Sequence, residues 1–233
     1  MTPREALTQG LTELRLYCPQ AVDKLLQFSD LLLEKNKVMN LTAVTDPLEV
    51  VTRHFLDCAA LAPWVRGEGE PLSVVDVGCG AGFPGVPLAI LTGAHVTLLD
   101  SLNKRILFLQ AVIDALPLTY AQAVHSRAEE FGHRGAFDVA TSRAVARLNV
   151  LAELSLPLVR VGGRFIAMKA DDCADEVHEA ERAIKLLGGE IEAVEPYTVP
   201  LTDLTRRLVV VRKTRETPAK YPRRFAKISA SPL

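Results

Sequence analysis

The stretch that decides the fold runs from Leu72 to Gly85 and reads LSVVDVGCGAGFPG. Its first half, residues 72–77, is a short apolar run, and its second half is rich in glycine. A short apolar run without polar alternation is typical of a strand that is buried on both faces of a parallel sheet. Glycines directly after such a strand permit positive φ angles and let a ligand approach the backbone closely. We therefore expect residues 78–85 to form a ligand-binding loop between a strand and a helix.

Downstream of this loop, the chain alternates between strand-like and helical patterns. Further short apolar runs occupy residues 96–100, 121–124, 137–141 and 163–168. Helical patterns separate some of these runs, at 103–116 and 149–159. Such alternation predicts a parallel sheet with helices on both faces. After a charged helix at 171–187, two runs at 191–199 and 207–211 have no helix-length segment between them, so we expect a hairpin with at least one antiparallel strand.

Upstream of the loop, the sequence predicts helices. Apolar residues recur at three- and four-residue spacings over 22–33, and a second apolar stripe runs over 48–62. His54 lies at the edge of the second stripe, with Asp57 one turn further on. Residues 67–71, GEGEP, have the composition of a linker. We therefore expect an N-terminal helical extension at 1–70, a sheet domain at 71–215 and a basic C-terminal tail at 216–233.

The composition is that of an ordinary globular protein, with 48% hydrophobic and 24% charged residues. No apolar run approaches the ~18 residues of a membrane-spanning helix. The N-terminus lacks the layout of a signal peptide, and the four cysteines stand far apart without Cys-x-x-Cys spacing, so we expect reduced thiols in a cytoplasmic protein. Cys173, Asp175 and His178 share one predicted helix without a coherent ligand spacing, and we expect no metal.

The net charge of −1 conceals an asymmetry along the chain. Residues 204–233 hold nine Lys or Arg and one acid, which gives +8, so the remaining residues carry −9. A basic tail on an acidic body can contact a nucleic acid, or it can be a solvated tail without a partner. We take Arg223 and Arg224 as candidates for contacts with RNA phosphate. The alternative is that these two arginines dock the tail onto the acidic body.

The glycine loop and Asp100 together indicate a nucleoside ligand, because a carboxylate at the end of the second strand can accept hydrogen bonds from ribose hydroxyls. Read from Gly80, the loop fits Gly-x-Gly-x-x-Gly, and Asp100 lies at about the spacing expected for NAD. Three features favour S-adenosylmethionine instead. Asp76 precedes the first glycine by two residues, Phe83-Pro84 lies inside the loop, and the sheet closes with a hairpin rather than a second mononucleotide-binding half. A tight turn without any ligand is the remaining alternative.

Several segments together resemble those of a known family. They are KVMNLTA at 37–43, HFLD at 54–57, residues 76–87, residues 99–105, residues 127–130, residues 142–144 and YPRR at 221–224. In this order they are similar to the bacterial small-subunit ribosomal RNA guanine-N7 methyltransferases, once called glucose-inhibited division protein B. The resemblance runs from about Leu25 to the C-terminus, and the tail departs from the family's pattern after Arg224.

The resemblance implies a Rossmann-like class I methyltransferase fold with a mostly parallel, seven-stranded sheet. It implies transfer of a methyl group from S-adenosylmethionine to N7 of one guanine in 16S ribosomal RNA, either as free RNA or within the small ribosomal subunit. By the same analogy, Asp100 holds the ribose of the cofactor and Arg143 faces the cofactor at the reaction centre. The other cofactor-binding residues that the resemblance implies are Gly78, Gly80, Phe83, Ala128 and Glu129.

The chemistry of this transfer limits what the protein has to do. Guanine N7 carries a lone pair in the neutral base, so the protein chiefly aligns the reactants and excludes water. A carboxylate near the base can stabilise the positive charge that develops there, and Asp57 and Glu129 are candidates. For Asp57 the alternative is a salt bridge to Arg53. His54 either contacts the base or the cofactor or is a packed histidine, and Asn40 either contacts the substrate or caps a turn.

Three other functions stay open from the sequence. A non-catalytic RNA-binding or ribosome-assembly factor could keep the cofactor fold, although the intact loop with Asp100 and Arg143 argues against it. A small-molecule methyltransferase has the same cofactor requirements, but the basic tail and the lack of a substrate-lid domain weigh against it. An NAD-dependent oxidoreductase is the most distant alternative.

Overall fold

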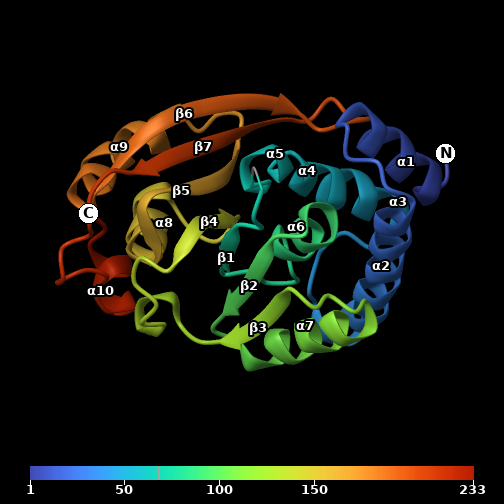
Figure 1. Ribbon diagram of the computed structural model, residues 1–233, viewed down its shortest axis with the longest axis horizontal. Coiled ribbons are helices and arrows are strands. Elements are labelled where there is room, and N and C mark those ends of the chain that lie inside the picture. The colour runs from blue at the N-terminus through green and yellow to red at the C-terminus, as the bar shows by residue number, and fades with distance from the viewer. Residues whose placement is uncertain (68) are drawn as a thin grey trace.

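The sheet of the protein has seven strands in the order β3-β2-β1-β4-β5-β7-β6 in the computed structural model, which describes residues 1–67 and 69–233 (Figure 1). The strands are β1 (Ser73–Val77), β2 (His95–Asp100), β3 (Ala121–His125), β4 (Phe137–Arg143), β5 (Val159–Ala170), β6 (Gly189–Thr198) and β7 (Thr205–Lys213). Strands β1 to β5 pair in parallel, and β7 runs antiparallel to both β5 and β6. The predicted parallel sheet with a C-terminal hairpin is therefore confirmed.

The two faces of the sheet bury different side chains, because successive residues of a strand point to opposite faces. Val74 and Ile166 pack on the face that carries the N-terminal helices, whereas Val75 and Phe165 pack on the other face. All four are fully buried. The apolar runs that lack polar alternation are thus explained by a sheet that is covered on both sides.

Helices complete the three layers. The first face is covered by α1 (Pro3–Glu13), α2 (Pro19–Met39), α3 (Pro47–Val50), α4 (Leu56–Ala59), α5 (Ala62–Val65), α6 (Gly85–Thr92) and α7 (Asn103–Ala115). The second face is covered by α8 (Leu148–Ser155), α9 (Ala174–Leu186) and α10 (Phe225–Ala230). Two 3₁₀ turns, η2 (Ala128–Glu130) and η3 (Leu156–Leu158), precede β4 and β5. No helix in the described ranges is long and apolar enough to cross a membrane.

The second predicted apolar stripe is not one regular helix. A π-helical segment, η1 (Val51–Phe55), separates α3 from α4, and the Leu56 amide donates to the Val51 carbonyl. A π turn adds one residue to a helical turn, so it rotates the following side chains relative to those before it. Residues 55–59 are consequently all buried, while Arg53 and His54 face the cleft described below.

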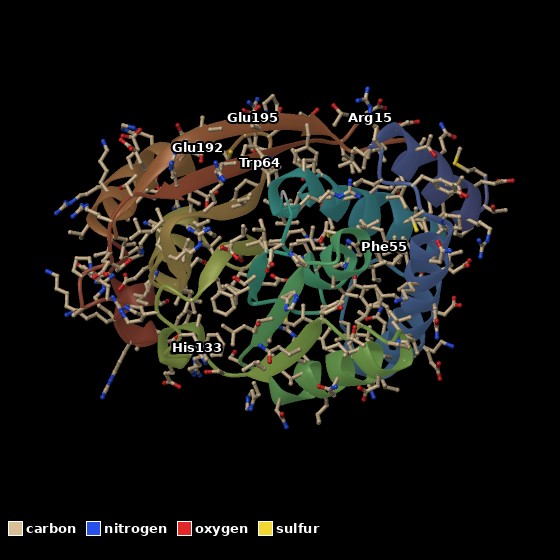
Figure 2. All side chains as sticks on the ribbon, viewed as in Figure 1. Arg15, Phe55, Trp64, His133, Glu192 and Glu195 are labelled. Atoms are coloured by element: carbon tan, nitrogen blue, oxygen red, sulfur yellow. The ribbon has the colours of Figure 1, made fainter. Side chains whose placement is uncertain are left out.

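Aromatic side chains hold the N-terminal helices to one another and to the hairpin β6–β7. Phe55, labelled in Figure 2, stacks on Phe28 with ring centroids 5.6 Å apart, which joins η1 to α2. Trp64 of α5 lies beneath the hairpin, where the Arg164 guanidinium sits 5.9 Å above its ring and donates at 2.8 Å to Glu192 of β6. The N-terminal extension is thereby packed against both the sheet and the hairpin.

Helix α1 lies in the region 1–70 that was expected to be helical but before its first apolar stripe, whereas α10 lies in the tail, where no helix was expected. Helix α1 begins with a capping box, in which the Thr2 hydroxyl accepts from the Glu5 amide and the Glu5 carboxylate accepts from the Thr2 amide. The sequence TPRE at 2–5 has the Thr-x-x-Glu spacing of this capping box. The predicted linker at 67–71 includes residue 68, which lies outside the described residues.

Candidate active site

A cleft of about 810 Å³ lies at the carboxyl ends of the parallel strands. Its lining comes from the loop after β1, the ends of β2, β4 and β5, the π segment η1 and the far end of the hairpin. The predicted residues that line it are His54, Asp57, Gly78, Gly80, Phe83, Asp100 and Arg143. This edge of an open α/β sheet is the usual position of a ligand site.

The glycine loop is tied to the end of β2 by its own backbone. The Gly78 and Cys79 amides donate to the Leu99 carbonyl at 2.8 and 3.1 Å, and the Gly80 amide donates to the Asp100 carboxylate at 2.9 Å. Gly80 has a φ of +58°, and a Cβ built on it would have only the Gly78 carbonyl oxygen nearby, at 4.0 Å. The backbone therefore leaves room along the cleft for a ligand that lies close to the chain.

Asp76 holds the loop from beneath. It is fully buried, and its Oδ2 accepts from the Gly85 amide at 2.7 Å at the start of α6. Burial raises the pKa of Asp76 to about 7, while the Gly85 hydrogen bond opposes that rise. Asp76 Oδ1 has no hydrogen-bond partner among the described residues. The acid thus fixes the entry of the chain into α6 rather than lining the cleft.

Asp100 lies at the end of β2 with one carboxylate oxygen almost fully engaged. Its Oδ2 accepts from the Gly80 amide and from Arg105 at 3.2 Å, and its Oδ1 accepts from the Leu102 amide at 2.8 Å. A carboxylate offers about four acceptor positions, so roughly one remains for a ligand unless Arg105 moves away. The Arg105 side chain is 38% exposed and lines the cleft, so it has space to move.

Arg143 ends β4 and is held on three sides. Its Nη1 donates to Asp57 Oδ2 at 3.0 Å, and it lies 3.4 Å from the Arg53 carbonyl. The guanidinium centre sits 4.8 Å above the Phe83 ring, within the range of a cation–π contact. Burial opposes the charge of Arg143, but its neighbours, among them the hydrogen-bonded Asp57 carboxylate, outweigh this effect and raise the pKa of Arg143 above its ordinary value, so this side chain carries its charge throughout the physiological range.

His54 is neutral at physiological pH. Burial lowers its pKa to about 4, and the Arg143 charge acts in the same direction. The neutral tautomer with a proton on Nδ1 satisfies the Arg53 carbonyl and the Thr42 hydroxyl, but Nδ1 then does not accept from Arg143 Nη2, which lies 3.4 Å away. In that tautomer Nδ1 donates to the Arg53 carbonyl at 3.0 Å, and Nε2 accepts at 2.9 Å from the Thr42 hydroxyl, which itself accepts from the Val44 amide. His54 therefore packs and hydrogen-bonds at the cleft wall rather than standing free as a base.

Asp57 has both carboxylate oxygens engaged by side chains. Oδ2 accepts from Arg143, and Oδ1 accepts from the Tyr197 hydroxyl at 2.7 Å. The alternative pairing with Arg53 is wrong, because Arg53 pairs instead with Glu49 at 3.4 Å. Tyr197 was not predicted to be a site residue, because it lies 140 residues from Asp57 and no local sequence pattern places the end of β6 beside α4.

The other predicted residues lie elsewhere. Asn40 ends α2 with a φ of +49°, as a capping residue does, and Ala128 and Glu129 form the 3₁₀ turn η2. None of these three is among the described residues that line the cleft. Arg223 donates from Nε to Glu153 of α8 at 2.8 Å, whereas Arg224 is exposed. For Arg223, this geometry favours the docking alternative.

Further lining residues were not singled out from the sequence. Thr42 and Val44 follow α2, Lys169 lies near the end of β5, and Arg206 lies near the start of β7. Cys58 and Cys79 are buried free thiols, and burial raises the pKa of Cys58 to about 12. Within residues 1–67 and 69–233, no group of three or more His, Cys, Asp or Glu side chains is placed to hold a metal ion.

Comparison with known proteins identifies the family. The GidB family model, described as rRNA small subunit methyltransferase G, matches residues 21–205. The chain belongs to this family. It is 43% identical over its whole length to the ribosomal RNA small subunit methyltransferase G of Alkaliphilus oremlandii, with all of that protein covered. The Geobacillus thermodenitrificans protein of the same name is 45% identical, with 92% of each chain covered.

Solved structures support the fold. A geranyl diphosphate methyltransferase in complex with SAM superposes with a TM-score of 0.55 at 13% identity, covering 69% of this chain and 85% of that one. A Burkholderia thailandensis 1,6-didemethyltoxoflavin-N1-methyltransferase superposes with a TM-score of 0.51 at 16% identity, covering 68% and 77%. The predicted methyltransferase fold is confirmed. Membership of the rRNA methyltransferase G family confirms the predicted enzyme class.

Proposed function

We propose that this protein transfers a methyl group from S-adenosylmethionine to N7 of a guanine in 16S ribosomal RNA, in the cytoplasm. The observation that carries this proposal is the convergence of three features on one cleft. The glycine loop, the Asp100 carboxylate and the Arg143 guanidinium come from three different strand ends and line the same space. Membership of the rRNA small subunit methyltransferase G family supports the assignment of the substrate.

The cleft fits S-adenosylmethionine in shape and chemistry. Gly80 leaves open space beside the backbone, and Asp100 offers a carboxylate oxygen with free capacity at the end of β2. We assign the ribose to Asp100 and the cofactor's methionine part to the loop around Gly78 and Phe83. When bound, the cofactor supplies an electrophilic methyl group on a sulfonium centre.

The protein's own part in the transfer is alignment and exclusion of water. Guanine N7 attacks as a neutral lone pair, so the site needs no base to remove a proton first. His54 fits this requirement, because its lowered pKa keeps it neutral and its ring nitrogens are already hydrogen-bonded. Asp57 is already paired with Arg143, so we assign it the role of holding that guanidinium at the reaction centre.

Three arginines line the cleft and supply positive charge that suits an RNA substrate. They are Arg53, Arg105 and Arg206, from η1, α7 and β7. Their positive charges suit phosphate groups flanking a guanine that enters the cleft. These arginines lie at the cleft itself, whereas part of the basic tail is engaged with the body of the protein.

The test combines a methylation assay with ligand binding. Purified protein is incubated with S-adenosylmethionine and either bare 16S RNA or small ribosomal subunits, and the RNA is digested and analysed by mass spectrometry for 7-methylguanosine. Calorimetry compares S-adenosylmethionine with NAD. We expect methylation of one guanine, binding of S-adenosylmethionine only, and an affinity loss in Asp100→Ala of about 1.5–3 kcal/mol, as for a hydrogen bond to a charged group.

Asp114→Ala is the matched control, because Asp114 is an exposed carboxylate of α7 that bonds Gln110 away from the cleft. Its cofactor affinity should equal that of the wild type. Tighter binding of NAD would overturn the proposal. Binding of cofactor and RNA without any methyl transfer would favour the non-catalytic assembly factor instead.

A further inference from the structure

Tyr197 stands where the hairpin reaches the N-terminal helices. It lies at the end of β6, its ring is partly buried and lines the cleft, and its hydroxyl donates to Asp57 Oδ1 at 2.7 Å. Asp57 is itself only 5% exposed and lies in α4. The contact therefore joins two segments that are distant in sequence, inside the wall of the site.

The Asp57 carboxylate transmits this contact to Arg143. Tyr197 occupies one of its oxygens and Arg143 occupies the other, at 3.0 Å. Two donors on opposite oxygens fix the rotation of a carboxylate, and hydrogen bonds to a charged acceptor are among the stronger ones in proteins. The opposite support of Arg143 is the Phe83 ring, 4.8 Å from the guanidinium centre. Its orientation thus depends on Asp57, whose orientation depends on Tyr197.

We propose that Tyr197 is a positioning residue for methyl transfer, which acts through Asp57 to hold the Arg143 guanidinium at the reaction centre. The inference rests on the proposed function, because it takes Arg143 to face the reacting atoms. It adds the hairpin to the catalytic apparatus: the end of β6 does not merely close the sheet but orients a side chain at the end of β4.

The hydroxyl is not what attaches the hairpin to the body. The tip of the hairpin is anchored by apolar packing, since Val199 is fully buried and packs in the same core as the N-terminal helices, together with Leu204. The Val199 amide also donates to the Leu204 carbonyl at 2.9 Å. Removal of one hydroxyl from Tyr197 leaves these contacts in place, so positioning and folding can be separated by experiment.

The protonation state of Tyr197 agrees with a donor role. Burial raises the pKa of this phenol far above its ordinary value, and the Asp57 charge adds to the rise, while Arg206 opposes it weakly. The phenol therefore keeps its proton wherever the protein is folded near neutral pH, and Asp57 has a permanent donor on Oδ1.

The decisive variant is Tyr197→Phe, which keeps the ring and removes the hydroxyl. We expect the single-turnover rate constant for methyl transfer to fall about tenfold, the equivalent of ~1.4 kcal/mol. The dissociation constants for S-adenosylmethionine and RNA should stay within about twofold, because the variant changes orientation rather than contact. Tyr120→Phe is the control, since Tyr120 is exposed beside His95 on the far edge of the sheet and its hydroxyl is remote from the cleft.

A double-mutant cycle separates positioning from packing. In an Asp57→Asn background the pathway from Tyr197 to Arg143 is already altered, so Tyr197→Phe should cost less than twofold in rate. The same tenfold loss in both backgrounds would overturn the proposal, as would an unchanged rate in the single variant. If the wild-type protein itself methylates no RNA, the proposed function fails and not this inference alone.

A readout without turnover comes from urea denaturation in the same double-mutant cycle. The free energies of unfolding of the wild type, Tyr197→Phe, Asp57→Asn and the double variant are compared. Because the two side chains are in direct contact, the losses should be non-additive. Additive losses would contradict the Tyr197–Asp57 contact.

Discussion

The charge of each side chain around the cleft is set by its neighbours. His54 is kept neutral by burial and by Arg143, whereas Arg143 is kept charged beside Asp57. The buried Asp76 beneath the loop has a pKa raised to about 7, so it exchanges its proton near neutrality. A site with a neutral imidazole and a fixed guanidinium suits a nucleophile that needs no deprotonation.

For His54 this environment predicts a particular dependence of rate on pH. The single-turnover rate should show no rise near pH 6.5, the ordinary pKa of histidine, because His54 is already neutral above its lowered pKa of about 4. His54→Ala should lose only a modest part of the rate, through packing against Phe83, whose ring centroid is 4.6 Å away. Rate profiles of the two proteins provide the check. A sigmoidal rise near pH 6.5 in the wild type that is absent from the variant would contradict the prediction.

The same lowered pKa affects stability with a definite sign. The folded protein binds fewer protons at His54 than the unfolded chain between pH 6.5 and about 4, so His54 contributes stability that is lost as the pH falls through this window. The slope is at most ~1.4 kcal/mol per pH unit. Asp76 has the opposite sign, since its raised pKa makes folding more favourable as the pH falls from about 7 to 3.8. The His54 contribution is therefore measured as the difference between the wild type and His54→Gln.

Single residues of the site differ in how far the sequence could reveal them. Asp100 and the glycine loop were predicted from their place at the ends of apolar runs, because the carboxyl ends of parallel strands share one edge. The position of Arg143 at the reaction centre was implied by the family resemblance. Tyr197 lies near the end of a segment, residues 189–198, that mixes apolar residues with glutamates, and nothing in that segment indicates that the hairpin reaches Asp57. The assignment of a partner to Asp57 failed for the same reason, because its donors are 86 and 140 residues away.

At the scale of elements, two glycines of the same loop, Gly80 and Gly85, have different structural roles. Gly80 has a φ of +58°, and a Cβ built on it would come no closer than 4.0 Å to a neighbour, whereas a Cβ on Gly85 would lie 2.3 Å from Leu98 Cδ2 and 2.9 Å from Asp76 Oδ2. The first glycine permits a backbone conformation beside the cleft, and the second permits close approach of α6 to the sheet. A sequence pattern alone gives both the same role.

This difference predicts opposite outcomes for two matched substitutions. Gly85→Ala should lower the free energy of unfolding by about 1–3 kcal/mol, as overpacking does, because Leu98 and Asp76 must both shift. Gly80→Ala should cost stability only through its left-handed backbone, about 1–2 kcal/mol, but should also weaken S-adenosylmethionine binding by placing a methyl group in the cleft. Urea denaturation and calorimetry measure the two quantities. Equal cofactor affinity in Gly80→Ala and the wild type would contradict the assignment of Gly80 to the ligand.

The π segment η1 is an element whose helical character could be predicted from the sequence but whose extra residue could not. The apolar stripe over 48–62 correctly indicated helix, and the capping pair of Asp46 with the Glu49 amide was present in the sequence and in the structure. The extra residue of η1 carries no local signal, because it follows from how Val51 and Phe55 pack against the rest of the core. That packing is long-range, whereas the periodicity of the stripe is local.

At the scale of the whole molecule, part of the basic tail is hydrogen-bonded to the body of the protein. Arg134 donates to the Thr217 carbonyl at 2.6 Å and to the Tyr221 carbonyl, and the ammonium group of Lys213, which is 2% exposed, bonds Thr217. The tail thereby runs back over the second face of the sheet, and Figure 1 shows α10 beside α8. The sequence correctly predicted a basic tail. It did not indicate which of the basic side chains bond to the protein itself and which are exposed to a substrate.

Substitution of Arg223 and of Arg224 tests which tail arginine stabilises the fold and which is free to bind RNA. The Arg223 side chain is 15% exposed and pairs with Glu153, which is fully buried, whereas Arg224 is exposed. Removing one partner of a buried ion pair leaves the other charge uncompensated, so Arg223→Ala should lower the free energy of unfolding by about 3–5 kcal/mol. Arg224→Ala should leave stability nearly unchanged, because an exposed arginine without a buried partner contributes little.

Arg223→Ala should have the larger effect on stability, whereas Arg224→Ala should have the larger effect on the salt dependence of RNA binding. If Arg224 neutralises a phosphate, its loss should weaken RNA binding and reduce the slope of log affinity against log salt by about one phosphate equivalent. Arg223→Ala, measured at a temperature where it is fully folded, should keep the wild-type slope, since its guanidinium is committed to Glu153. Cofactor affinity should be unchanged in both, because the cleft lining does not include either residue among those described. A flatter slope in Arg223→Ala with no loss of stability would reverse the assignment and make this arginine the RNA contact.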